Sequence, residues 1–372
     1  MKQGWEYKKL GDCTQILDSQ RKPVTKKDRT GGIYPYYGAT GIQDYVDKYI
    51  FDGRYVLVGE DGAKWSAFEQ SAFIIEGKSW VNNHAHVLKP HDFLVDTFLI
   101  YFLNYSDLDS YISGAIVRKL TQASLRNIEI PLPPKSTQLA IVSELDKINE
   151  LIRLKKEQLK DFDNLAQSIF YEMFGDPVEN EKGWEVKKLG EVCCVGTGST
   201  PNRKNKDFYE NGIYPWVKST EVCNLPIYSV EEYITQEALD KTNCTLYPQN
   251  TILMAMYGQG KTRGQIGLLK IEACTNQAVA AIVPTKEVVD ENYICLHLML
   301  MYEHIRNMAR GGNQANLNLS IVKSIQIILP PLPLQHLFAH RIEQIEHQKT
   351  EVLIAIADLE TLLASRMQYW FE

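Results

Sequence analysis

The sequence contains no run of about 18 apolar residues, so it offers no segment that could cross a membrane as a helix. Its first residues, MKQGWEYKKLGD, also lack the apolar core of a signal peptide. We therefore expect a cytoplasmic protein without membrane attachment. The 372 residues, of which 44% are apolar, are enough for two globular domains and additional structure.

Cysteine is too scattered to build a covalent or metal-bound framework. The seven cysteines include no Cys-x-x-Cys pair, so we expect neither disulfides nor a zinc site. The chain also lacks a Gly-x-Ser-x-Gly motif, and no glycine fingerprint is followed by the Asp-Pro-Pro-Tyr or Asn-Pro-Pro-Phe of amino-methyltransferases. The absence of these catalytic patterns favours a binding protein over an enzyme.

The net charge of −6 is unlike the strongly basic balance of many nucleic-acid-binding proteins. It does not exclude DNA as a partner, because phosphate contacts require only local positive charge. If DNA is bound, the sequence predicts basic loops and not a wholly basic face.

An apolar stripe with alternating spacings of four and three residues occurs twice, and this heptad pattern predicts two long helices. A lysine interrupts each stripe, at 155 and at 349. The first stripe contains Ile141, Leu145, Ile148, Ile152, Leu159, Phe162 and Ile169. The second contains Phe338, Ile342, Ile345, Val352, Ile356, Leu359 and Leu363. Because neither helix is apolar all round, we expect the two to pair as an antiparallel coiled coil on the order of 50 Å long.

The chain is also an internal duplication. The segment Gly4-Trp-Glu-Tyr-Lys-Lys-Leu-Gly11 returns 179 positions later as Gly183-Trp-Glu-Val-Lys-Lys-Leu-Gly190. Each copy ends in a proline cluster and a glutamine, Gln138 or Gln335, placed just before a heptad stripe. We therefore predict an α+β protein with a pseudo-two-fold internal repeat: two tandem mixed α/β domains separated by the long antiparallel two-helix coiled coil.

The central parts of the two copies are predicted to contain loops, strands and helices. A glycine-rich loop with aromatic residues is expected at 31–41, and short strands and a helix follow in each copy. The strands are predicted at 55–58, 72–75, 85–88, 251–255 and 278–283, and the helices at 96–111 and 291–308.

Gly258-Gln-Gly-Lys-Thr262 resembles the end of a phosphate-binding P-loop. The motif requires glycine at position 255, where the chain has alanine, and the following residues predict a turn and strand instead of a helix. We therefore interpret the segment as a hairpin loop, either merely solvated or with Lys261, Arg263 and Gln265 directed at a partner.

Two further patterns leave alternatives open. Asp61 with Glu76 and Lys78 has the outline of a metal-dependent nuclease, in which carboxylates hold Mg²⁺ and a lysine assists water. His84 and His86 share one face of a predicted strand, as zinc ligands can, but the sequence shows no third ligand. Local hydrogen bonding is the expected role of both histidines.

The two copies of Gly-Trp-Glu-x-Lys-Lys-Leu-Gly, each leading to prolines, a glutamine and a heptad helix, resemble the specificity subunit of type I restriction-modification systems. Gly59-Glu-Asp-Gly62 and Trp80–Leu88 resemble stretches of that family's target recognition domains, as do Asn276-Gln-Ala278 and Ala280–Pro284. The resemblance covers nearly the whole chain.

This resemblance implies a DNA-binding, non-catalytic subunit that reads the two halves of a split site in double-stranded DNA. It also implies partners: two modification subunits that hold S-adenosylmethionine and methylate adenine N6, and restriction subunits that hydrolyse ATP with Mg²⁺. No cofactor is then expected in this chain. The expected domains are target recognition domains at 1–134 and 175–333, and spacer helices at 135–174 and 334–372.

Base and phosphate contacts are expected from loop residues of suitable chemistry. In the first domain these are Tyr36, Tyr37, Lys64, Arg118 and Lys119; in the second they are Lys204, Lys261, Arg263, Gln265, Asn313 and Gln314. Two alternatives remain, a stand-alone Mg²⁺-dependent nuclease using Asp61, Glu76 and Lys78, and a coiled-coil adaptor that binds no DNA.

Overall fold

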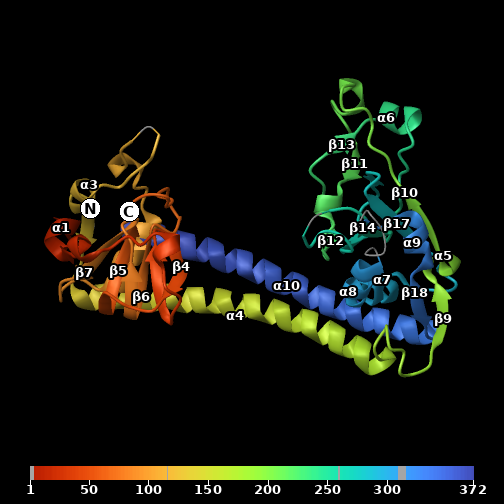
Figure 1. Cartoon of the computed structure of the whole chain (residues 1–372), viewed down its shortest axis with the longest axis horizontal. Coiled ribbons are helices and arrows are strands. Elements are labelled where there is room, and N and C mark those ends of the chain that lie inside the picture. Colours follow the sequence, from red (N-terminus) through yellow and green to blue (C-terminus); the bar gives the residue numbers. More distant parts are fainter. Residues whose placement is uncertain (1–3, 115, 259, 309–315) are drawn as a thin grey trace. The chain divides into compact units, whose positions relative to one another are not determined.

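The computed structural model describes residues 4–114, 116–258, 260–308 and 316–372. The chain forms two compact units, the first made of Met1–Glu157 with Leu353–Glu372 and the second of Gln158–Val352. In Figure 1 the blue C-terminal end of the chain can be followed into the red and orange first unit. Each unit combines sheets with helices, so the mixed α/β content predicted for two domains is confirmed. No helix among the described residues is long and apolar enough to span a membrane.

The first unit is built on a six-stranded sheet with the strand order β2-β7-β5-β6-β3-β4. The second half of strand β5 contains Tyr-Val-Leu-Val. Val56 and Val58 face one core and Leu57 the other, since alternate residues of a strand point to opposite faces. The helix α2 covers the face that holds Val56 and Val58. The elements are β1 Glu6–Lys9, α1 Leu10–Cys13, β2 Thr14–Ile16, β3 Tyr34–Gly38, β4 Gly41–Val46, β5 Phe51–Gly59, β6 Ala72–Val81, β7 Ala85–Pro90, α2 Asp96–Tyr105, α3 Gln122–Arg126 and β8 Glu129–Leu132.

The second unit contains a five-stranded sheet, β10-β17-β14-β15-β12, and a three-stranded sheet, β13-β11-β16. Strand β14 repeats the logic of β5, with Ile252 and Met254 in one core and Leu253 and Ala255 in the other. The elements are β9 Glu185–Lys188, α5 Leu189–Val192, β10 Cys193–Thr197, β11 Tyr214–Val217, β12 Pro226–Ile227, β13 Tyr233–Ile234, α6 Gln236–Lys241, β14 Ile252–Ala255, β15 Ile266–Leu269, β16 Cys274–Thr275, β17 Val279–Pro284, α7 Glu291–Leu300, α8 Tyr302–Met308, α9 Leu319–Ser324 and β18 Gln326–Leu329.

The repeated sequence segments build the same small frame in each unit. Strand β1 pairs with β8 so that Glu6 lies opposite Leu132, and β9 pairs with β18 so that Glu185 lies opposite Leu329. In each copy the glycine of Leu-Gly is the second residue of a short helix, α1 or α5, and close packing accounts for it. A Cβ on Gly11 would come within 3.0 Å of the Arg126 side chain, and one on Gly190 equally close to that of Lys323.

Two 40-residue helices, α4 Lys135–Phe174 and α10 Leu332–Phe371, run through both units. Inside the first unit, Trp370 donates to Glu144 at 3.1 Å and Lys156 pairs with Glu360 at 2.8 Å. Inside the second, Lys349 pairs with Asp163 at 2.9 Å. In the first unit, where two such pairs are found, rising numbers in α4 meet falling numbers in α10, so the helices are antiparallel there. No residue of the two predicted stripes is exposed.

The end of each long helix closes the core of a unit. At the end of α10, Phe371 lies 5.5 Å from Phe98 and 5.7 Å from Phe102, measured between ring centroids. At the end of α4, Phe174 lies 4.9 Å from Tyr293 and 5.3 Å from Phe338. The core of the first unit is therefore completed by Phe371, which lies more than 260 positions after Phe98 and Phe102.

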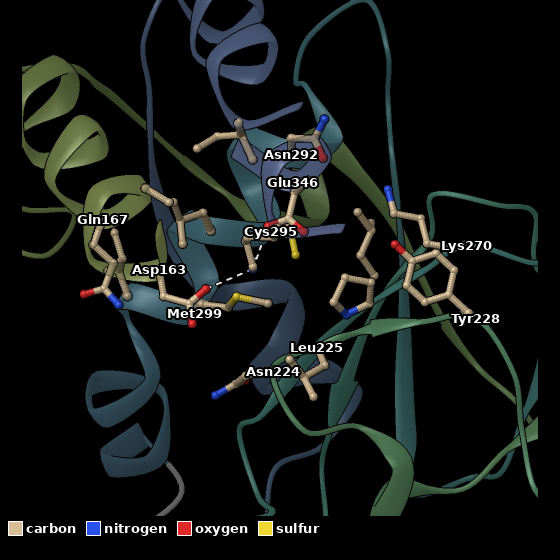
Figure 2. Close-up of a pocket in the computed structure, with 17 residues that line it drawn as sticks. Asp163, Gln167, Asn224, Leu225, Tyr228, Lys270, Asn292, Cys295, Met299 and Glu346 are labelled. Carbon is tan, nitrogen blue, oxygen red and sulfur yellow. Dashed lines mark hydrogen bonds and ion pairs between the residues drawn. The ribbon is translucent and has the colours of Figure 1, made fainter. Parts of the chain in front are cut away.

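A cavity of about 400 Å³ in the second unit lies where the two long helices meet α7 and the segment before β12. Asp163 and Glu346 both line this cavity (Figure 2). Lys349, the lysine in the second stripe, is also part of its wall and binds both of them. Burial alone would lower the pKa of Lys349, but hydrogen bonds to Glu346 and Asp163 outweigh it and raise that pKa. The interruption of the apolar stripe is thus compensated by ion pairs.

The glutamine before each stripe is fully buried and joins the start of a long helix to its own domain. Gln138 accepts from Val95 N–H at 2.8 Å and donates to the carbonyls of Phe93 and Pro133, both at 2.9 Å. Gln335 accepts from Asp290 N–H at 3.0 Å and donates to Pro330 O at 2.7 Å. Each amide satisfies backbone groups just before α2 or α7 and just before its own long helix, which would otherwise lack partners.

We expect Gln138→Ala to destabilise the first unit by about 2 kcal/mol, because it leaves the Val95 N–H and two carbonyls unpaired. Gln335→Ala should do the same in the second unit. Amide hydrogen exchange measures the effect: each variant should speed exchange in α2 or α7 of its own unit. Lys147→Ala, an exposed position of α4, is the control. Unchanged exchange in both glutamine variants would contradict this role.

Candidate nucleic-acid interface

The first unit presents a small basic hairpin. The backbones of Ser113 and Lys119 exchange hydrogen bonds of 2.9 and 2.8 Å. Gly114 has φ +94°, and a Cβ there would lie 2.1 Å from Val117 O, so the turn requires glycine. We call residues 116–119 the Arg118 loop.

Both cations of the Arg118 loop have acidic partners. Arg118 is exposed and pairs with Asp109 at 2.6 Å, and its guanidinium lies 5.8 Å from the Trp65 ring. Lys119 pairs with Glu60 at 2.7 Å, a hydrogen bond that raises the pKa of the lysine. An exposed pair such as Arg118 with Asp109 contributes little stability, so a phosphate can replace the carboxylate at small cost.

A buried polar network lies beneath this loop. His86 is fully buried; its Nδ1 lies 2.6 Å from Asp18 and its Nε2 lies 2.8 Å from Leu120 O. Gln122 also donates to Asp18, at 2.9 Å. Burial would raise the pKa of Asp18, but hydrogen bonds from His86, Gln122 and Val87 N–H outweigh it and lower that pKa. The carboxylate is therefore held ionised beneath the loop.

The ligand atoms of Asp18, Glu60 and His86 lie within 4.8 Å of one another, close enough to hold a metal ion. Two side-chain cations already balance these carboxylates. Arg21 binds Glu60 at 2.5 Å and Asp18 at 3.3 Å, and Lys119 binds Glu60. We therefore interpret the cluster as an ion-pair network that positions the Arg118 loop. The prediction that His84 shares a strand face with His86 is wrong, because β7 begins at Ala85 and His84 lies in the turn before it. His84 pairs with Asp61, so each histidine has a carboxylate partner, in accord with the expected hydrogen bonding.

One predicted contact of the first domain is wrong. Tyr36 is 1% exposed, its hydroxyl donates to Val24 O at 3.3 Å, and Arg29 covers its ring. The segment predicted as a loop at 31–41 instead contains β3 and the start of β4, and strand alternation turns Tyr36 inward. Tyr37 is half-buried with its ring centroid 6.0 Å from that of Phe73, and Lys64 is exposed and pairs with Glu69 at 3.1 Å.

In the second unit the turn between β14 and β15 carries three predicted contacts. Lys261 is exposed, whereas Arg263 and Gln265 are half-buried. We call residues 260–264 the Lys261 loop. After this turn the chain enters strand β15 and not a helix, so the hairpin interpretation is confirmed and the P-loop is excluded.

The remaining predicted positions of the second domain lie apart from the Lys261 loop in sequence. Lys204 is exposed in the segment before the 3₁₀ turn Lys206–Phe208. Its neighbour Arg203 lies 4.8 Å from the Trp216 ring and pairs with Glu232. Asn313 and Gln314 lie outside the described residues.

The nuclease pattern is not assembled. Glu76 on β6 lies opposite Arg54 near the start of β5, whereas Asp61 follows Gly59 at the end of that strand. Five residues of strand separate the two positions, or roughly 17 Å at about 3.3 Å per residue. Glu76 pairs with Arg54, and Lys78 lies 4.8 Å from the Tyr49 ring. These residues therefore cannot share one Mg²⁺, and this alternative was wrong.

Sequence reasoning missed the residues that hold the loops. Arg306 and Tyr302 of α8 bind the carbonyls of the Lys261 loop, and Arg21, Asp18 and Glu60 support the Arg118 loop. Of these, the residues that bind the loops directly lie 41 or more positions away from the loop residues they bind, and only Glu60 stood in a stretch that the sequence had marked, Gly59-Glu-Asp-Gly62. Only the tertiary structure brings them together.

The chain thus has two α+β units with basic loops, and each unit contains part of both long helices. A family model described as a type I restriction modification DNA specificity domain matches the chain twice, at residues 2–161 and 181–356. The chain therefore belongs to the family of type I restriction-modification specificity subunits. Its role in such a system is specificity and not catalysis.

The chain is similar to individual relatives over most of its length. It is 30% identical over 351 residues to a putative type I restriction enzyme specificity subunit of Haemophilus influenzae, covering 92% of this chain and 87% of the relative. It is 21% identical over 369 residues to the MjaIX specificity subunit of Methanocaldococcus jannaschii, covering 90% and 85%. The fold is similar to the crystal structure of a type I S subunit from M. genitalium, with a TM-score of 0.60, 13% identity, and 99% and 96% coverage.

We expect Asp18→Asn to destabilise the first unit by about 3 kcal/mol at pH 7, because it leaves part of the buried cation network uncompensated. Since folding lowers the pKa of Asp18 below its usual 3.8, the stabilisation exists above that value and is lost as the pH falls through the folded-state pKa. The difference between variant and wild type should therefore shrink below about pH 4.

Amide exchange in β7 at several pH values measures this difference, with the exposed Asp52→Asn as control. A destabilisation that stays equally large at pH 3 would contradict the ionised-carboxylate interpretation.

Proposed function

We propose that this chain reads a bipartite site in double-stranded DNA, with residues 1–134 recognising one half-site and residues 175–333 the other. The observation that carries the proposal is the tandem match of a DNA specificity domain to both halves of the chain. The matched strand registers of β1·β8 and β9·β18 support a repeated frame, and hence a pseudo-two-fold repeat. The loops between the frames differ, as two dissimilar half-sites would require.

The helices at 135–174 and 334–372 would act as the spacer between these target recognition domains. The residues of both apolar stripes are buried or half-buried, and this and the ion pairs Lys156 with Glu360 and Lys349 with Asp163 support an antiparallel coiled coil. Helices of 40 residues at about 1.5 Å per residue are roughly 60 Å long, more than one DNA turn of about 34 to 36 Å. A spacer of fixed length would fix the separation of the two half-sites.

The proposed contacts are side chains at the surface or its margin whose chemistry suits DNA. Arginine and lysine bind phosphates or guanine edges, and glutamine can pair with adenine. The set comprises Tyr37, Lys64, Arg118, Lys119, Lys204, Lys261, Arg263 and Gln265, together with Asn313 and Gln314 outside the described residues.

Catalysis would come from partner subunits. Two modification subunits with S-adenosylmethionine would methylate adenine N6, and restriction subunits would use ATP and Mg²⁺. A solved structure that concerns complex assembly and conformational transition of the type I restriction-modification system has a similar fold, with a TM-score of 0.61, 18% identity, and 100% and 98% coverage. The acidic helix α10, with Glu343, Asp358 and Glu360 exposed, offers a surface for such a partner.

We expect the purified chain to show neither methylation nor cleavage, and the chain mixed with modification subunits to methylate adenine at a bipartite motif. Modified-base sequencing of the product DNA measures this. Methylation or Mg²⁺-dependent cutting by the chain alone would contradict a purely recognising role.

Lys261→Ala should weaken DNA binding by the reconstituted complex and reduce the slope of log affinity against log salt by about 0.9, since one phosphate contact is lost. Lys286→Ala, also exposed in the second unit, is the matched control. If neither affinity nor salt slope responds to Lys261→Ala and Arg118→Ala, the adaptor alternative is favoured instead.

A further inference from the structure

The Lys261 loop is rich in glycine, which makes a chain flexible. Gly260 and Gly264 have φ +66° and +86°, and Gly258 just before them has φ +139°. These left-handed conformations are accessible to glycine with little strain, but glycine loses more conformational entropy on ordering than any other residue. Fixing one residue costs about 1 to 2 kcal/mol, so a loop of this composition needs external support to keep one shape.

The short helix α8 supplies that support through two side chains. Arg306 donates to Gly260 O at 2.8 Å and to Arg263 O at 3.1 Å. Tyr302 donates its hydroxyl hydrogen to Lys261 O at 2.5 Å and accepts from Arg306 at 2.6 Å. The guanidinium has five donors in a rigid fork and no acceptor, which suits a group of converging carbonyls.

The close packing at Gly264 adds a steric restraint. A Cβ at this position would lie 3.2 Å from Arg306 Cγ and 3.6 Å from the Tyr302 ring. Helix α8 therefore binds three carbonyls of the loop, and the loop backbone at Gly264 packs against it. The Lys261 side chain remains exposed, and Arg263 has a buried Nε with no hydrogen-bond partner among the described residues.

We propose that Arg306 and Tyr302 are positioning residues that fix the Lys261 loop for recognition of the second domain's half-site without contacting DNA themselves. The inference rests on the proposed function of the chain. Arg306 directs its fork at the protein backbone, so its contribution is pre-organisation: the loop need not be ordered when DNA binds. The Arg118 loop has a separate support in Glu60 and its network, so the other half-site should not depend on Arg306.

The test uses the full chain reconstituted with its modification subunits, on duplexes that carry the motif found by modified-base sequencing. Competitor duplexes have a single base pair changed in one half-site or in the other. Three variants are compared with wild type. Arg306→Lys keeps the charge but loses the fork, Tyr302→Phe keeps the ring but loses the hydroxyl, and Asn307→Ala is an exposed control on α8.

We expect Arg306→Lys to lose about tenfold or more of the discrimination against base changes in one half-site, because the loop must now be ordered on binding. Discrimination at the other half-site, the thermal unfolding temperature and the salt slope should stay unchanged. Tyr302→Phe should show a smaller loss at the same half-site, and Lys261→Ala should weaken binding through that half-site as well. Asn307→Ala should behave as wild type.

Three results would overturn the proposal. Unchanged discrimination at both half-sites would show that the loop needs no support from α8. Equal losses of discrimination at both half-sites, together with a lower unfolding temperature, would show that Arg306 has a general structural role. A salt slope reduced by about 0.9 in Arg306→Lys would mean that Arg306 itself touches phosphate. A wild-type complex without preference for any bipartite site would instead overturn the proposed function, and this inference with it.

Discussion

The structure depends on a requirement of the backbone: polar groups that are buried must find partners. Each long helix leaves its domain at a buried junction where the chain, after a proline cluster, passes the segment before α2 or α7. Gln138 and Gln335 meet this requirement with one side-chain amide each, which accepts one N–H and donates to nearby carbonyls. The direction in which each helix leaves its domain is therefore fixed by hydrogen bonds as well as by apolar packing.

The two basic loops are held in place by different kinds of interaction. Beneath the Arg118 loop, Asp18, Arg21 and Glu60 form ion pairs that are largely shielded from solvent, so loss of one member would leave its partner's charge uncompensated. The Lys261 loop is instead held by neutral carbonyls that converge on one guanidinium. Loops held by such separate supports can change independently, which suits domains that would recognise unlike sequences.

Much of the frame could be predicted because its signals are local and periodic. The heptad stripes specify helices through side-chain spacing, and the repeated Leu-Gly marks a position where a Cβ would be tightly packed. The candidate interface was less predictable because exposure is a tertiary property. Tyr36 stood among glycines and was expected in a loop, but β3 pairs with β4 and β6 and turns the ring into the core. Asp61 and Glu76 were close in sequence, yet Glu76 lies in the middle of β6, opposite Arg54, and Asp61 lies beyond the far end of β5. Arg306 carried no signal, because its partners are carbonyls more than 40 positions away.

The position of Phe371 in the first unit has a consequence for biosynthesis. Met367 and Phe371 belong to the same apolar core as Phe98 and Leu145, so the half of the protein that is made first cannot finish its interior until residue 371 has left the ribosome. During translation the nascent N-terminal half carries an open hydrophobic surface while the second half is still being synthesised. Maturation of the first unit is thereby tied to the docking of Met367 and Phe371, the residues of α10 that complete its core.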